Sequence, residues 1–113
     1  MPVVTETFAL LPCSKATTTG LEGCAEHRIL TLDQRINVLR HQVFTRLFDD
    51  AAKRRFIRAE VSWSKFRRST CLSDSDVNEG GSLAPVDFAN CAVRLDQQHV
   101  ADLTALLASY ASH

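Results

Sequence analysis

Residues 21–47, LEGCAEHRILTLDQRINVLRHQVFTRL, decide the fold class of this 113-residue chain. Apolar side chains recur in this stretch at steps of three and four residues: Leu21, Ala25, Ile29, Leu32, Ile36, Leu39, Val43 and Leu47. This spacing places them on one face of an α-helix. Charged side chains lie between them and are interpreted as solvent-exposed: Glu26, Arg28, Asp33, Arg35, Arg40 and Arg46.

The ends of three helices carry their own signals. Thr19 and Glu22 match a capping box, which predicts a first helix over residues 20–48. Asp49 and Asp50 interrupt the apolar pattern, and either can cap a second helix over residues 51–72. Pro85 is tolerated in a first helical turn, which predicts a third helix over residues 84–110.

The inner faces of the later helices follow the same periodicity. The second is predicted to bury Ala52, Phe56, Ala59, Trp63, Phe66 and Thr70. The third is predicted to bury Phe88, Ala92, Leu95, His99, Leu103, Leu106 and Tyr110. With no alternating strand pattern, the chain is predicted to be all-α, one domain over residues 1–113 with an irregular segment 1–18. A first helix about 40 Å long predicts an elongated antiparallel three-helix bundle or hairpin.

Composition excludes several classes of function. The chain has 13 basic and 13 acidic residues, and this neutral balance argues against a dedicated nucleic-acid-binding protein. The basic run 53–55 is interpreted as an exposed helix face. No apolar run approaches the roughly 18 residues of a membrane-spanning helix. No metalloprotease, hydrolase or phosphate-loop pattern occurs, so neither an enzyme nor a cofactor is expected.

Four cysteines allow three disulfide pairings. We favour Cys13–Cys24 and Cys71–Cys91, because each closes a short local loop at a predicted helix end; each would contribute about 3 kcal/mol. The alternative is four reduced, buried thiols in a cytosolic protein. Disulfides predict an extracytoplasmic protein, periplasmic or secreted. Residues 1–13 lack the features of a signal peptide, so we expect any signal to lie outside this numbering.

The segment between Cys71 and Cys91 contains Asp74, Asp76, Glu79, Gly80 and Gly81. The first residues alternate as in a calcium-binding EF-hand loop, but the glycine and the bidentate glutamate of that loop are missing, so no metal is expected. Two interpretations stay open. A stiff acidic loop would favour a basic protein partner. A plain solvated turn would need the two glycines only for positive φ.

The order of motifs resembles a known family. Cys13 and Cys24 are followed by DQRIN at 33–37, then WSKFRRSTC at 63–71, GGS at 80–82 and Cys91. Over about residues 8–107 this resembles the LprI-type lysozyme-inhibitor family of small bacterial extracytoplasmic domains. The resemblance implies that Trp63, Phe66 and Arg67 lie beside Cys71, and that Asn37 matches an asparagine of the first helix.

Physical chemistry gives these motif residues structural roles. Trp63 and Phe66 are expected to fill the core, and Arg67 to donate to loop carbonyls or pair with a loop carboxylate. Family members commonly have a threonine, an arginine and an aromatic residue where this chain has Asp96, His99 and Arg40. These three positions are interpreted as one helix seam that shapes packing or a partner surface.

The resemblance implies a protein-binding domain that inhibits lysozyme-type muramidases. Its expected mechanism is steric occlusion of the substrate cleft, with the acidic loop 74–79 as the contact. The alternative is a structural or assembly module of the bacterial cell envelope that does not inhibit lysozyme. Because amphipathic helices can also pair with a second copy, a homodimer is possible.

Overall fold

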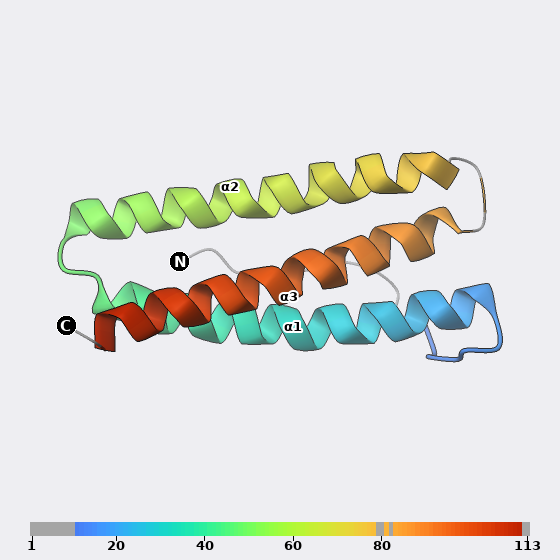
Figure 1. Cartoon of the computed structure of the whole chain (residues 1–113), viewed down its shortest axis with the longest axis horizontal. Helices are drawn as coiled ribbons and strands as arrows, with labels where there is room; N and C mark the ends of the chain where they lie inside the picture. Colours follow the sequence, from blue (N-terminus) through green and yellow to red (C-terminus); the bar gives the residue numbers. More distant parts are fainter. Residues whose placement is uncertain (1–10, 79–80, 82, 112–113) are drawn as a thin grey trace.

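The computed structural model describes residues 11–78, 81 and 83–111, and it is an elongated bundle of three helices. They are α1 (Thr18–Arg46), α2 (Asp50–Ser75) and α3 (Ala84–Ala111), with a short 3-10 helix η1 (Asp76–Asn78) after α2. α2 runs antiparallel to both α1 and α3 (Figure 1). The molecule measures 49 × 23 × 21 Å. The described residues contain no strand, so the predicted all-α, elongated architecture is confirmed.

Five of the six helix ends differ from their predicted positions, by one to three residues. α1 begins two residues early, because the side chain of Thr17, rather than that of Thr19, accepts a hydrogen bond from the backbone of Gly20. Asp49 caps α2 by accepting from the amide of Ala52 at 2.7 Å, as one of the two predicted alternatives. α2 continues to Ser75, so most of the segment predicted as loop after residue 72 is helical.

Packing is uneven among the helices. α3 packs closely on both α1 and α2, whereas α1 and α2 lie farther apart from each other. One apolar cluster lies at the Cys71–Cys91 end and consists of Ala25, Ile29, Cys71, Ala89, Cys91, Ala92 and Val93. The other lies toward the opposite end and consists of Ile36, Leu39, Val43, Phe56 and Leu103. Burial of these side chains supplies the main driving force for folding.

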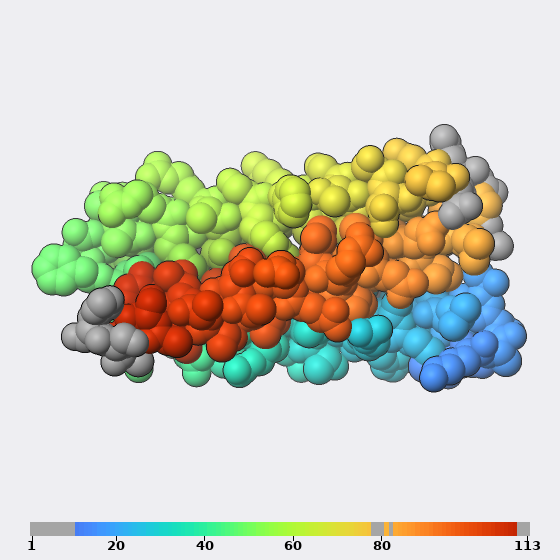
Figure 2. Space-filling model, in the orientation of Figure 1, coloured from blue at the N-terminus to red at the C-terminus, as the bar shows by residue number. Residues whose placement is uncertain are grey.

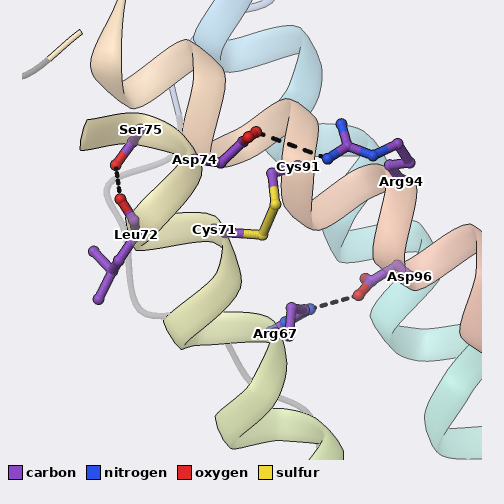
Figure 3. Close-up of a disulfide and its surroundings, with 8 residues drawn as sticks. All are labelled: Arg67, Cys71, Leu72, Asp74, Ser75, Cys91, Arg94 and Asp96. Atoms are coloured by element: carbon purple, nitrogen blue, oxygen red, sulfur yellow. Dashed lines mark hydrogen bonds and ion pairs between the residues drawn. A yellow bond between two sulfur atoms is a disulfide. The ribbon is translucent and has the colours of Figure 1, made fainter. Parts of the chain in front are cut away.

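Both favoured disulfides are present. Cys13–Cys24 fastens the segment before α1 to the first turns of that helix. Cys71–Cys91 joins α2 to α3 inside the first apolar cluster (Figure 3). All four cysteines lie among the described residues and are paired, so the structure shows the disulfide-bonded state rather than four reduced thiols. None of the described helices is long and apolar enough to cross a membrane.

Candidate functional site

A layer of buried charged side chains separates the two apolar clusters. We call it the buried polar layer, and its members are Asp33, Arg40, Glu60, Arg67, Asp96 and His99. The predicted exposure of Asp33 and Arg40 is therefore wrong, as is that of Glu26, whose side chain is also buried. Arg40 and Asp96 are the most deeply buried of these side chains, with at most 1% of their surface exposed. Buried charges require partners, and these residues find them across the three helices.

Arg67 of α2 joins all three helices within this layer. Its Nη1 donates to Oδ1 of Asp33 on α1 at 3.0 Å and to Oδ1 of Asp96 on α3 at 2.7 Å. The predicted partners of Arg67 were loop carbonyls or a loop carboxylate, but these carboxyls come from the middle of two helices. Figure 3 shows Arg67, one turn below Cys71, pointing across from α2 toward Asp96 on α3.

One positive charge faces two carboxyls in this group. Burial raises the pKa of Asp33 from its ordinary value of 3.8 to about 8; the hydrogen bond and negative charge of Asp96 also raise it, and Arg67 opposes them. Asp33 is therefore protonated at neutral pH, which leaves one ion pair, Arg67–Asp96. The Oδ2 atoms of Asp33 and Asp96 have no partner in the ionised form. A proton held between the two carboxyls removes this deficit.

The second half of the layer is centred on Glu60. Its Oε1 accepts from Nε of Arg40 at 2.6 Å and lies 2.7 Å from Nε2 of His99. Burial raises the pKa of Glu60, but the hydrogen bonds and charges of His99 and Arg40 outweigh it, so the pKa lies below the ordinary value. Glu60 is consequently ionised at neutral pH and balances Arg40.

Trp63 connects the two halves of the layer. Its ring stacks on that of His99, with centroids 4.0 Å apart and an angle of 11° between the planes. The guanidinium carbons of Arg40 and Arg67 lie 5.7 and 5.4 Å from the indole centroid. Cations over an indole face are favourable, so these contacts stabilise the arrangement of Trp63 among the buried charged side chains.

Phe66 does not share that role. Its side chain is 54% exposed, so its predicted burial is wrong. The inner face of α2 contains Glu60 and Arg67, where the apolar pattern favoured Ala59 and Phe66 one position earlier. The sequence held a signal for this: Asp33 and Arg40, like Glu60 and Arg67, are seven residues apart, which keeps both on one helix face. Asn37 is half-buried between the first pair.

The three departures from the family pattern meet in this layer. Arg40 lies on α1, and Asp96 and His99 lie on α3, so they do not form a seam on one helix. All three are buried, which rules out a direct contribution to a partner surface. They surround Trp63 and Arg67, two residues that do match the family motif.

The acidic segment occupies one end of the molecule. Asp74 lies in the last turn of α2 and Asp76 begins η1, so the predicted acidic loop is partly helical. Nη2 of Arg94 lies 3.7 Å from Oδ2 of Asp74, in a solvent-exposed pair (Figure 3). Val77 is 83% exposed and lines an open depression with Asp74. Gly81 is exposed, whereas Glu79 and Gly80 lie outside the described residues.

We call Leu72, Asp74, Asp76 and Val77 the acidic end. Each of these side chains is exposed, and Cys71 at 0% exposure anchors the turn beneath them to α3. Protein interfaces generally have an apolar centre and a polar, solvent-accessible rim. Among the described residues no group of three His, Cys, Asp or Glu side chains is placed to hold a metal.

A family model described as "Lysozyme inhibitor LprI" matches residues 13–103. The chain belongs to the LprI family. The match spans both disulfides, the buried polar layer and the acidic end. The family is described by an inhibitory activity rather than by an enzymatic reaction. No curated protein and no solved structure gives a significant match.

Proposed function

We propose that this LprI-family chain is an extracytoplasmic inhibitor of a lysozyme-type muramidase, and that it occludes the substrate cleft with its acidic end. The proposed inhibitory activity is based on the family match. Two disulfides are consistent with an oxidising compartment. The choice of surface rests on the exposed Val77 beside Asp74 and Asp76.

The shape of the acidic end supports occlusion. It lies at one tip of an elongated molecule of 49 × 23 × 21 Å, an end that it shares with the first residues of α1 (Figure 2), so the protein can approach a cleft end-on rather than with its long side. The Cys71–Cys91 disulfide holds the base of the tip rigid. A rigid contact loses less conformational entropy on binding than a mobile loop does.

The charge of each side chain at the acidic end determines how deeply it can enter the substrate cleft. A glycosidase cleft carries two catalytic carboxyl groups, which would repel Asp74 or Asp76 from the catalytic centre. Val77 has no charge and is suited to the cleft itself. The two carboxylates then contact the basic rim of the enzyme, where they increase the association rate.

The experiment is an inhibition assay with the oxidised full chain against c-type and g-type lysozymes at two salt concentrations. The first variant, Asp74→Asn/Asp76→Asn/Glu79→Gln, is expected to weaken inhibition about tenfold and to flatten its salt dependence. The second, Val77→Ser, is expected to weaken inhibition without changing the salt dependence. Circular dichroism checks that both variants remain folded.

A matched control comes from the opposite end of the molecule. Phe48, in the turn between α1 and α2, is 97% exposed. Phe48→Ser is expected to leave inhibition unchanged. If it abolishes inhibition while the acidic-end variants do not, the contact lies at that opposite end. Folded, disulfide-bonded protein that inhibits no lysozyme would instead favour the envelope assembly module.

A further inference from the structure

The outer face of α2 is strongly basic although the chain as a whole is neutral. We call its central row the basic stripe: Arg54, Arg58, Val61, Lys65, Arg68 and Leu72. These side chains are all exposed, and they follow one another at steps of four, three, four, three and four residues. That spacing keeps them on one side of the helix, over a length of about 27 Å.

The positive charge of the stripe is not neutralised within the protein. Between residues 51 and 73 the acidic residue of α2 is Glu60, which is buried against Arg40 on the opposite side of the helix. Arg54, Arg58, Lys65 and Arg68 have no ion-pair partner in the described part of the chain. α2 forms one long edge of the bundle, so its outer face is accessible along most of its length (Figures 1 and 2).

Apolar side chains lie within and beside the stripe. Val61 is 37% exposed and Leu72 45%; Phe66, which is 54% exposed, lies about 100° round the helix from Lys65, at the margin of the exposed face of α2. Apolar side chains are not stabilised by contact with the phosphate backbone of a nucleic acid, but they can enter the interfacial region of a bilayer. A row of cations with interspersed apolar groups on a straight helix is complementary to a flat anionic lipid surface.

We propose that the outer face of α2 binds the anionic surface of a phospholipid bilayer, with the helix lying parallel to the membrane plane. The cations contact the lipid phosphates, and Phe66 and Val61 insert at the level of the headgroups. The bundle stays folded, because none of these side chains contributes to either apolar cluster. Asp50 and Asp76 lie just beyond the two ends of the stripe and limit its footprint.

The experiment measures co-sedimentation of the oxidised full chain with vesicles of phosphatidylcholine alone and of phosphatidylcholine with phosphatidylglycerol in equal amounts. Binding is expected on the anionic vesicles and is expected to fall about tenfold between 50 and 300 mM salt. Replacing Arg54, Arg58, Lys65 and Arg68 by Gln is expected to weaken this binding at least tenfold, since one cation near such a surface contributes about fivefold.

Two further variants sharpen the test. The control replaces four exposed cations outside α2, Lys15, Arg28, Arg35 and Arg46, by Gln, and is expected to change affinity less than about threefold. Asp50→Asn/Asp76→Asn is expected to tighten vesicle binding, because it removes the carboxylates at the ends of the stripe. An equal loss in the control and stripe variants would overturn the proposal, as would equal binding to neutral vesicles.

A soluble polyanion distinguishes binding to lipid from binding to nucleic acid. Phe66→Ser is expected to weaken vesicle binding several-fold, because Phe66 enters the bilayer interface. A single-stranded thymidine oligonucleotide should bind weakly and respond equally to the wild type and to Phe66→Ser. Binding of this oligonucleotide as tight as that of vesicles, with no effect of Phe66→Ser on either, would replace the lipid proposal with a nucleic-acid one.

Discussion

Arg67 faces two carboxyl groups, and this ratio of one cation to two acids determines how the residue-scale interactions respond to pH. A carboxyl that binds its proton more tightly in the folded chain than in the unfolded chain stabilises the fold most at low pH. For Asp33 that contribution is full below pH 3.8 and is lost as the pH rises toward about 8. Glu60 has the opposite sign, since its lowered pKa means that stability is lost when acid protonates it.

We predict that Asp33→Asn makes stability less dependent on pH. Asparagine imitates the protonated acid, so it can still accept from Arg67 and donate to Asp96. Between pH 5 and 8 the wild type should lose about 2–4 kcal/mol more unfolding free energy than the variant. Urea unfolding at several pH values measures this. The control is Asp102→Asn on the exposed side of α3, which should follow the wild type; equal slopes for all three proteins would contradict the shared-proton description.

The cation that balances Glu60 can come from either side of it. Arg40 on α1 and His99 on α3 both contact Glu60. An arginine at position 99 would supply a guanidinium from α3 instead of α1. Exchanging the cation between the two positions therefore tests whether they can substitute for each other.

A double-mutant cycle tests this exchange. Arg40→Tyr alone should cost about 3–5 kcal/mol, because Glu60 loses its guanidinium donor while buried. His99→Arg alone should also destabilise, since two guanidinium groups then face one carboxylate. The double variant restores one cation and one anion, so the coupling energy from urea unfolding should reach about 2 kcal/mol. Additive costs within about 0.5 kcal/mol would show that the two positions do not substitute for each other.

At the scale of elements, the start of α1 depends on two glycines. The segment before the helix crosses it so closely that a Cβ on Gly23 would collide with the carbonyl oxygens of Leu11 and Pro12. Gly20 has the same relation to Ser14. The Cys13–Cys24 disulfide then fastens the crossing segment in place. The helix therefore tolerates residues of poor helix propensity because the close approach requires them.

Gly23→Ala provides a test in which two effects have opposite signs. Alanine is favoured over glycine inside a helix by about 1 kcal/mol, so an unpacked helix would become more stable. The collision with Leu11 and Pro12 is instead expected to destabilise the protein by about 1–3 kcal/mol. Thermal unfolding followed by circular dichroism decides between them, and a rise in melting temperature would mean that residues 11–14 do not pack on α1 in solution.

At the scale of the whole molecule, the two disulfides constrain different parts. Cys71–Cys91 lies fully buried and joins two long helices across 20 residues of sequence. Cys13–Cys24 lies nearer the surface and closes 11 residues. The longer loop restricts the unfolded chain more, and the buried sulfurs also fill space in an apolar cluster.

We therefore predict that Cys71→Ala/Cys91→Ala costs more stability than Cys13→Ala/Cys24→Ala. The first pair should lose about 3–5 kcal/mol of unfolding free energy and the second about 2–3 kcal/mol. Urea unfolding of both variants beside the oxidised wild type measures the difference. Losing as much stability in the Cys13/Cys24 variant would show that the N-terminal segment contributes to the core of the bundle.

The sequence alone predicted the three helices, a cap at Asp49 or Asp50, Pro85 in the first turn of the third helix, the favoured disulfide pairing and the family, because these depend on local periodicity or on short spacings. The residues that line the helix interfaces could be predicted from the sequence only in part. A charged residue in a helix is expected to face solvent, unless residues elsewhere in the chain supply an opposite charge or a hydrogen bond for it. The residues that flank Arg40 and Arg67 in the sequence do not identify such partners.

The tertiary structure decided which charges are buried. Arg67 meets Asp33 across 34 residues and Asp96 across 29, and Arg40 meets Glu60 across 20. These distances along the chain are closed by the packing of α3 against α1 and α2. The buried polar layer and the outward position of Phe66 therefore depend on three helices at once, since burial of a charge becomes favourable only when partners from the other helices are in place.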